Sequence, residues 1–107
     1  MYLHLGADVV VKKEDIIAIM DMESSSVSRI TKEFLKNEEI SGRVINVDIE
    51  NLPKSYVLVQ CDKEKSYVYI SPIATQTLLK RANDNNLFEV WNFFQDGKEI
   101  KIWVMKK

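Results

Sequence analysis

The chain has 107 residues, of which 46% are hydrophobic and 29% are charged, a composition typical of one globular domain and not of a disordered segment. Its formal net charge is −1, so binding to nucleic acid would need a local basic patch, because the chain as a whole does not attract polyanions. No apolar run approaches the roughly 20 residues of a membrane span, and the single cysteine excludes an internal disulfide and favours a reducing, cytoplasmic location.

The beginning of the chain predicts three short strands. They cover residues 2–5, 9–11 and 16–20, where apolar and β-branched side chains predominate. Gly6 suits a turn after the first strand, and the charged residues 12–15 form a second turn that carries Lys12 and Lys13. We expect so apolar a segment to be tied into the sheet.

A helix is predicted from about residue 24 to residue 37. Three serines at 24–26 offer hydroxyl groups for its N-cap. Apolar residues recur at helical spacing, at Val27, Ile30, Phe34 and Leu35. A neighbouring face carries cations at i, i+3 and i+7, namely Arg29, Lys32 and Lys36. This basic stripe is either the solvated face of an amphipathic helix, which is the plainer interpretation, or a surface that contacts DNA phosphates and displaces counterions.

The middle of the chain predicts the strands that organise the fold. A strand at 43–49 is followed by a loop, broken by Pro53, that carries Lys54. The strands at about 56–61 and 67–70 have apolar side chains on both faces, because side chains alternate with period two. Both faces therefore need a cover, either from the rest of the chain or from a second copy. A second helix should follow, capped by Ser71, started by Pro72 and ending near Ala82.

Residues 83–107 predict a β-hairpin after a polar break. Segments 87–94 and 99–105 flank Asp96-Gly97, a strong turn signal. The hairpin contains both tryptophans, Trp91 and Trp103. A two-stranded hairpin is marginal alone, so it should pack on its own chain, which is the favoured interpretation, or form an interface. The predicted fold class is α+β, with an antiparallel β-sheet, two α-helices and a C-terminal β-hairpin extension.

The sequence offers little for catalysis, and we do not expect an enzyme. His4 and Cys61 are the only residues of their kinds and stand on separate predicted strands, so Cys61 is most simply a small core residue. The spaced Cys and His clusters of a zinc site are absent, and three isolated glycines form no phosphate-binding loop. No metal, cofactor, small-molecule ligand or membrane is expected as a partner.

Three stretches carry a resemblance to a known family. MYLHLGADVVVKKEDIIAIMD at the start, PKSYVLV at 53–59 and YISPIATQTLLKRA at 69–82 resemble the RemA/RemB family of small bacterial regulators of the extracellular matrix. The resemblance covers residues 1–82, which would form a RemA/RemB-like α+β domain, with 83–107 as a hairpin extension of the same domain. It implies a cytoplasmic protein whose copies assemble into closed rings that bind DNA and activate biofilm-matrix genes.

The chain departs from that family at two basic positions. The better-understood branch has two adjacent arginines in the loop before the strand at 56–59, where this chain reads Asn51-Leu52-Pro53-Lys54. The arginine expected ahead of the third strand is also unmatched, since Asp15 directly precedes Ile16. The resemblance therefore implies the fold and the assembly more firmly than it implies DNA binding.

Two functional hypotheses follow. The first is an oligomeric DNA-binding transcriptional regulator of extracellular-matrix genes, in which ring symmetry multiplies a weak basic patch. The alternative is an oligomeric interaction module, or a modulator of a DNA-binding relative, without its own DNA contact. The candidate nucleic-acid-binding residues are cations on turns and on a helix face, where they can reach phosphates: Lys12, Lys13, Arg29, Lys32, Lys36 and Lys54.

Overall fold

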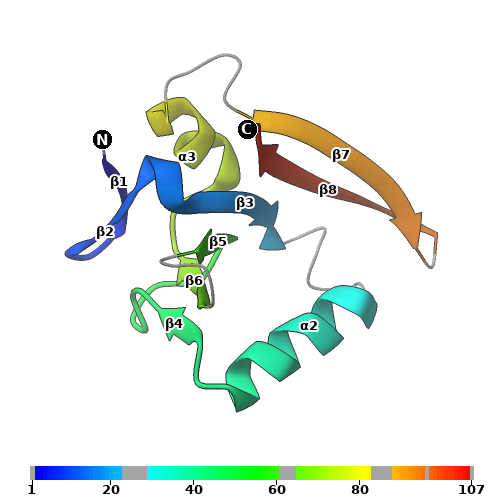
Figure 1. Cartoon of the computed structure of the whole chain (residues 1–107), viewed down its shortest axis with the longest axis horizontal. Helices are drawn as coiled ribbons and strands as arrows, with labels where there is room; N and C mark the ends of the chain where they lie inside the picture. Colours follow the sequence, from blue (N-terminus) through cyan, green and yellow to red (C-terminus); the bar gives the residue numbers. More distant parts are fainter. Residues whose placement is uncertain (1, 23–28, 61–64, 83–87, 96, 107) are drawn as a thin grey trace.

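The computed structural model describes residues 2–22, 29–60, 65–82, 88–95 and 97–106 (Figure 1). Helices make up a small part of it. In chain order the elements are β1 (Tyr2–Gly6), β2 (Val9–Lys12), the 3-10 helix η1 (Lys13–Asp15), β3 (Ile16–Asp21), α2 (Arg29–Ile40), β4 (Val44–Asn46), β5 (Ser55–Gln60), β6 (Ser66–Ser71), α3 (Thr75–Ala82), β7 (Phe88–Gln95) and β8 (Lys98–Met105). The predicted helix cap at 24–26 and the apolar residue Val27 lie outside the described residues.

The main sheet has six strands in the order β4-β6-β5-β3-β8-β7. It is mixed, and the prediction of an antiparallel sheet is wrong at one edge, because β4 runs parallel to β6 with Val44 opposite Val68. The cause is the path of the chain. Segment 47–54 crosses the end of β6, where Val47 N–H donates to the Ile70 carbonyl and Lys54 N–H donates to that of Ser71. β5 then returns antiparallel to β6, so β4 has to run in the direction of β6.

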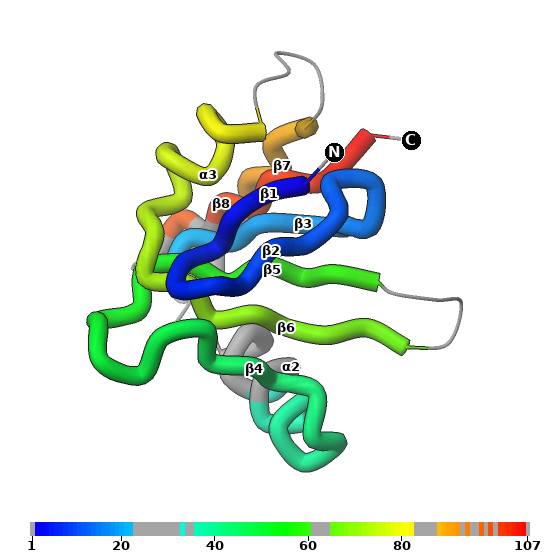
Figure 2. Tube along the Cα trace, turned by 90° about the vertical axis from the view of Figure 1, so that its left-hand side faces the viewer, coloured from blue at the N-terminus to red at the C-terminus, as the bar shows by residue number. Residues whose placement is uncertain are grey.

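The first two strands lie on the sheet instead of inside it. β1 and β2 form a separate two-stranded antiparallel sheet, which Figure 2 shows in front of β3, β5 and β6. The expectation that the N-terminal segment is tied into the sheet is therefore confirmed for β3, which pairs with β5 and β8, and wrong for β1 and β2. Its alternating residues Leu3 and Leu5 are almost completely buried, and face-to-face packing hides them as well as strand pairing would.

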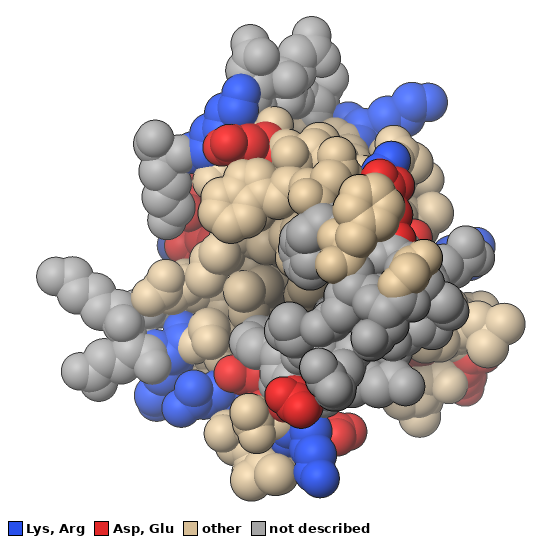
Figure 3. All heavy atoms as spheres, turned by 90° about the vertical axis from the view of Figure 1, so that its right-hand side faces the viewer, with Lys and Arg blue, Asp and Glu red and all other residues tan. Residues whose placement is uncertain are grey.

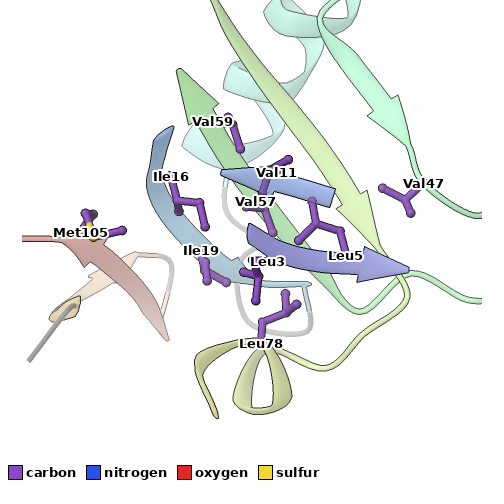
Figure 4. Close-up of a cluster of buried hydrophobic side chains, with 10 residues drawn as sticks. All are labelled: Leu3, Leu5, Val11, Ile16, Ile19, Val47, Val57, Val59, Leu78 and Met105. Atoms are coloured by element: carbon purple, nitrogen blue, oxygen red, sulfur yellow. The ribbon is translucent and has the colours of Figure 1, made fainter. Parts of the chain in front are cut away.

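The main core fills the space between this small sheet, α3 and the large sheet (Figure 4). β1 contributes Leu3 and Leu5, α3 contributes Leu78, and β3 and β5 face them with Ile19 and Val57. Each of these side chains is at most 1% exposed. Burying one such aliphatic side chain stabilises the fold by about 1.5–3 kcal/mol, so this cluster is what holds the N-terminal strands onto the sheet.

The opposite face of the sheet carries a second apolar cluster around Met20, Tyr56 and Val68. α2 lies on this side and contacts β4 and β6. Burial raises the pKa of the Tyr56 phenol, because removal from water disfavours the phenolate. The prediction that the central strands are apolar on both faces is confirmed, and much of the cover comes from the chain itself.

The second helix begins later than predicted. α3 starts at Thr75, not at Pro72, because Ser71 is the last residue of β6 and is paired with Ser55. The Ser71 hydroxyl donates to the Leu5 carbonyl (2.6 Å) and accepts from Ile73 N–H (3.1 Å). It therefore closes a local turn and does not cap the helix. Pro72 packs against Gly6, where an added Cβ would lie 3.1 Å from the proline Cδ.

The predicted C-terminal hairpin is confirmed. β7 and β8 pair antiparallel from Phe88–Met105 to Gln95–Lys98, and Gly97 takes the positive φ of 77° that such a turn favours. β8 also pairs with β3, so the hairpin extends the large sheet. The favoured interpretation, packing on its own chain, is confirmed for β8, since Trp103 packs against the main core. Trp91 on β7 is 53% exposed, and an interface role for the hairpin stays a prediction.

Candidate nucleic-acid interface

The structure gives the two lysines of the early turn different surroundings. Lys12 ends β2 and is exposed. Lys13 begins η1, and its Nζ donates to the backbone carbonyl of Ala82, 2.7 Å away at the end of α3. A cation at this position satisfies a carbonyl that the helix leaves unpaired and faces the negative end of the helix dipole. Lys13 therefore anchors α3, while Lys12 is available to a ligand.

The contact of Lys13 with α3 brings together cations that are far apart in the sequence. Lys80 and Arg81 stand in the last turn of α3 and are exposed. Together with Lys12 and Lys13 they form what we call the α3-end cluster. Sequence reasoning placed Lys80 and Arg81 at the end of a helix but did not count them as candidates. No local signal could have done so, because the bonded residues are 69 positions apart.

A shallow cleft adjoins the α3-end cluster on one side. It has a volume of about 240 Å³ and is lined by Tyr2, Val10, Val11, Lys12, Asp15, Val59 and Tyr69. Its walls are aromatic and aliphatic, and its two charged residues, Lys12 and Asp15, have opposite signs. Asp15 therefore reduces the positive potential that Lys12 contributes here, over a distance well within the Debye length.

Lys54 lies far from the α3-end cluster. Its backbone is fixed between two strand ends, since its N–H donates to the Ser71 carbonyl (2.8 Å) and its carbonyl accepts from Met22 N–H (3.1 Å). Its side chain is exposed. The next residue, Ser55, pairs with Asp21 at the end of β3, whereas η1 adjoins the start of that strand. Five residue steps at about 3.3 Å separate the two ends, roughly 16 Å.

The basic stripe of the first helix forms a third group of cations. The backbone positions of Arg29, Lys32 and Lys36 all fall within α2, and the Lys36 side chain is exposed. α2 packs on β4 and β6, on the side of the sheet opposite to β1 and β2 (Figure 2). The helix that carries the stripe therefore lies across the sheet from β1 and β2. One subunit presents its six predicted cations as three separate groups.

Basic and acidic side chains are interspersed on the described surface. On the face drawn in Figure 3, Lys and Arg side chains gather near the rim with Asp and Glu among them, and uncharged surface occupies the upper middle. Lys101 and Glu99 on β8 form an ion pair at 3.8 Å. On the described part of this face, a phosphate backbone would thus meet separate cationic groups with acidic groups between them.

The described residues offer no second chemistry beside these cations. In the described ranges, no three His, Cys, Asp or Glu residues gather in a way that could hold a metal ion. The His4 ring lies 2.7 Å from the Ala7 carbonyl, which is a local turn contact. Cys61 lies outside the described part of the chain. Among the described helices, none has the length and apolar character needed to cross a bilayer.

Two comparisons with known proteins give matches over most of the chain. A family model described as "RemA-like: Extracellular matrix regulatory protein A-like" matches residues 2–82. The chain is also 37% identical over 82 residues to "Extracellular matrix regulatory protein B" of Bacillus subtilis (strain 168), an alignment that covers 77% of this chain and 90% of that protein. The matched segment runs from β1 to the end of α3 and leaves β7 and β8 outside.

Proposed function

The chain belongs to the RemA-like family of extracellular matrix regulatory proteins, and we propose on that premise that it is an oligomeric DNA-binding transcriptional regulator of extracellular-matrix genes. The family and the relative's name support the regulatory role. The observation that carries DNA binding is the α3-end cluster, where Lys12, Lys80 and Arg81 are exposed around the α3 anchor Lys13. All four residues lie within the matched segment.

Oligomerisation is part of the proposal for an electrostatic reason. The net charge is −1, and the cations of one subunit form separate groups, so each subunit contributes only a few phosphate contacts. An assembly such as a ring repeats those contacts at fixed spacing, and binding of the first subunit raises the effective concentration of DNA at the others. None of the cations stands in a base-reading motif, so the contacts position the protein on the backbone more than they select a sequence.

An electrophoretic mobility-shift titration at two salt concentrations tests this proposal. The cluster variant Lys12→Ala/Lys80→Ala/Arg81→Ala leaves the α3 anchor Lys13 in place. If its three cations each contact a phosphate, it lowers the slope of log K against log salt by about 2.7, at roughly 0.9 per contact. Because the parent has the steeper slope, the loss of affinity is largest at low salt. The helix variant Arg29→Ala/Lys32→Ala/Lys36→Ala tests the α2 stripe in the same way.

A matched control comes from the hairpin. Lys101→Ala/Lys106→Ala removes two exposed cations from outside the segment that matches the family, and it should leave both affinity and salt slope unchanged. If the cluster variant binds DNA as the parent does at both salt concentrations, the α3-end cluster is a solvated surface and the proposed site is wrong.

The second candidate function is an oligomeric interaction module that modulates a DNA-binding relative. The observation that favours it is the acidic residues beside the cations: Glu14 and Asp15 directly follow Lys13 in η1. A parent protein that assembles but fails to shift DNA even at low salt would establish this second function and remove the first.

A further inference from the structure

The outer strand of the hairpin has an edge with little of the usual protection, since its one charged residue is Glu89 near its start. β7 is the terminal strand of the six-stranded sheet and is eight residues long. Natural edge strands discourage pairing by being short, by bulges, or by Lys and Pro residues. β7 contains no Lys, Arg or Pro, and its pairing with β8 runs without a register shift. The other terminal strand, β4, has only three residues.

Apolar side chains stand exposed along this edge. Val90 is 48% exposed, Trp91 53% and Phe94 75%. Side chains alternate between faces, so Val90 and Phe94 lie on one face and Trp91 on the other. Val90 pairs with Trp103 of β8 and lies on the same face, and Trp103 packs against the main core. A strand added along β7 would therefore cover apolar surface on both faces and also bond to an unpaired backbone edge.

Symmetry limits how β7 could pair with the same strand of a second copy. A two-fold axis normal to the sheet makes the two strands antiparallel and keeps each face continuous across the junction. Residues directly opposite each other in an antiparallel pair lie on the same face. The two opposing residues must then be separated by an even number of positions, so the axis passes through a residue and not between two.

The sequence of β7 selects the residue on that axis. From 89 to 95 it reads Glu-Val-Trp-Asn-Phe-Phe-Gln. With Asn92 on the axis, Val90 stands opposite Phe94, Trp91 opposite Phe93 and Glu89 opposite Gln95. Positions 93 and 95 are assigned from the backbone register of β7. The apolar residues at 90, 91, 93 and 94 then face one another, and no two acidic residues face each other. Phe88, the first residue of β7, would stand opposite position 96, beyond the end of the strand. With Trp91 on the axis, Val90 would face Asn92 and Glu89 would face Phe93.

We propose that β7 is a self-pairing interface, at which two copies of this chain join antiparallel about Asn92 into one continuous twelve-stranded sheet. Self-complementarity about Asn92 is the reason to assign the partner as a second copy and not an unrelated strand. The interface lies outside the segment matched by the family, so it is a feature that this chain adds. This interface deepens the proposed function, because it names a surface through which subunits associate. Only the biological role of the interface rests on the proposed function.

Cysteine crosslinking in the full-length Cys61→Ser chain tests the register directly. Asn92→Cys places two thiols on the axis at the spacing of adjacent strands, where Cα atoms are about 4.5–5.5 Å apart and a disulfide can form. Lys101→Cys is the matched control, because Lys101 is the Cα partner of Asn92 on β8 and is also exposed. In the proposed dimer, the two copies of position 101 would be three strand spacings apart, about 14 Å, which is too far for a disulfide.

The expected result under oxidation is a covalent dimer from Asn92→Cys and none from Lys101→Cys. A purified Asn92→Cys protein that stays monomeric, or a Lys101→Cys protein that crosslinks equally well, overturns the proposal. The first of these outcomes would also be the result if β7 received a strand of a different protein.

A second pair of variants tests the interface without introducing thiols. Val90→Lys sets a cation opposite Phe94, and the two-fold axis repeats this contact once more in the dimer. The variant should raise the dissociation constant of the dimer about tenfold or more, as measured by sedimentation. Ile49→Lys makes the same change at an 85%-exposed loop residue and should leave the dissociation constant unchanged. Equal dissociation constants for Val90→Lys and the parent would contradict the proposal.

The same proteins separate this inference from the proposed function. If Asn92→Cys crosslinks while the parent does not bind DNA at low salt, edge pairing stands and the DNA-binding function fails. If the parent binds DNA while Asn92→Cys does not crosslink, DNA binding stands and the edge-pairing inference fails.

Discussion

At the scale of single residues, two buried serines stand in the stretches 53–59 and 69–82 that carry the resemblance to the family. Ser55 and Ser71 are fully buried and stand opposite each other on β5 and β6. The Ser55 hydroxyl donates to the Ile73 carbonyl at 2.7 Å, and that of Ser71 donates to the Leu5 carbonyl at 2.6 Å. Leu5 stands at a bulge in the β1–β2 pairing, where no residue of β2 is opposite it. The serines therefore tie the bulge and the entry to α3 onto the sheet.

Replacement of Ser71 should destabilise the protein accordingly. Ser71→Ala leaves the Leu5 carbonyl and the Ile73 N–H without this partner inside the fold, and we expect a loss of about 2 kcal/mol in the free energy of unfolding. Ser41→Ala is the control. Ser41 also bonds a carbonyl, that of Asn37 at 3.1 Å, but it is exposed, so its loss should stay within about 0.5 kcal/mol. Urea denaturation measures both, and equal losses would contradict the assigned role.

At the scale of elements, the C-terminal hairpin both completes the sheet and adds a surface. β8 covers one edge of β3 by pairing Val104, Trp103 and Ile102 with Ala18, Ile19 and Met20. Met105 is buried in the main core. β7 reaches the core mainly at its first residue, Phe88, which packs against it. The inner strand therefore serves the stability of the fold, and the outer strand is free to serve association.

Deletion of residues 83–107 should leave a folded protein with exposed apolar surface. The main core keeps the contributions of β1, β3, β5 and α3, but β3 becomes an edge strand and Ile19 loses the cover of Trp103. We expect increased binding of a hydrophobic dye and lower solubility. Trp91→Ala in the full chain is the control, since it leaves β3 paired. A truncated protein without a cooperative unfolding transition would show that the fold requires the hairpin.

At the scale of the whole molecule, the cations stand in separate groups, and this arrangement is the reason why assembly is part of the proposed function. The α3-end cluster and Lys54 mark opposite ends of β3 and β5, and the α2 stripe lies on the other side of the sheet. A single subunit cannot bring all three groups to one straight duplex. Copies related by symmetry can align the same group repeatedly, which increases avidity without a stronger single site.

DNA binding should therefore be cooperative in protein concentration. In a titration of a duplex long enough for several subunits, we expect a Hill slope above one at low salt. Light scattering over the same concentrations should show species larger than the 12.4 kDa chain. A slope of one together with a stable monomer would show that each subunit binds alone, and it would remove assembly from the proposed function.

The sequence by itself determined the local elements and the family. Apolar and β-branched runs predicted β3, period-two alternation described β5 and β6, and Asp96-Gly97 with its flanking segments predicted the hairpin of β7 and β8. These signals depend on neighbouring residues only. The two-sided apolar pattern of the central strands correctly predicted that both faces of the sheet need a cover. Three stretches within residues 1–82 were enough to indicate the family that the comparisons then showed.

Tertiary structure alone decided which elements meet. Alternation tells which side chains share a face, but it does not tell which strand is the neighbour or in which direction that strand runs. The parallel pairing of β4, the packing of β1 and β2 on the sheet, and the late start of α3 all depend on such contacts. The bond from Lys13 to Ala82 joins residues 69 positions apart. The α3-end cluster exists only because the packing of Leu78 against the N-terminal strands brings the end of that helix to the early turn.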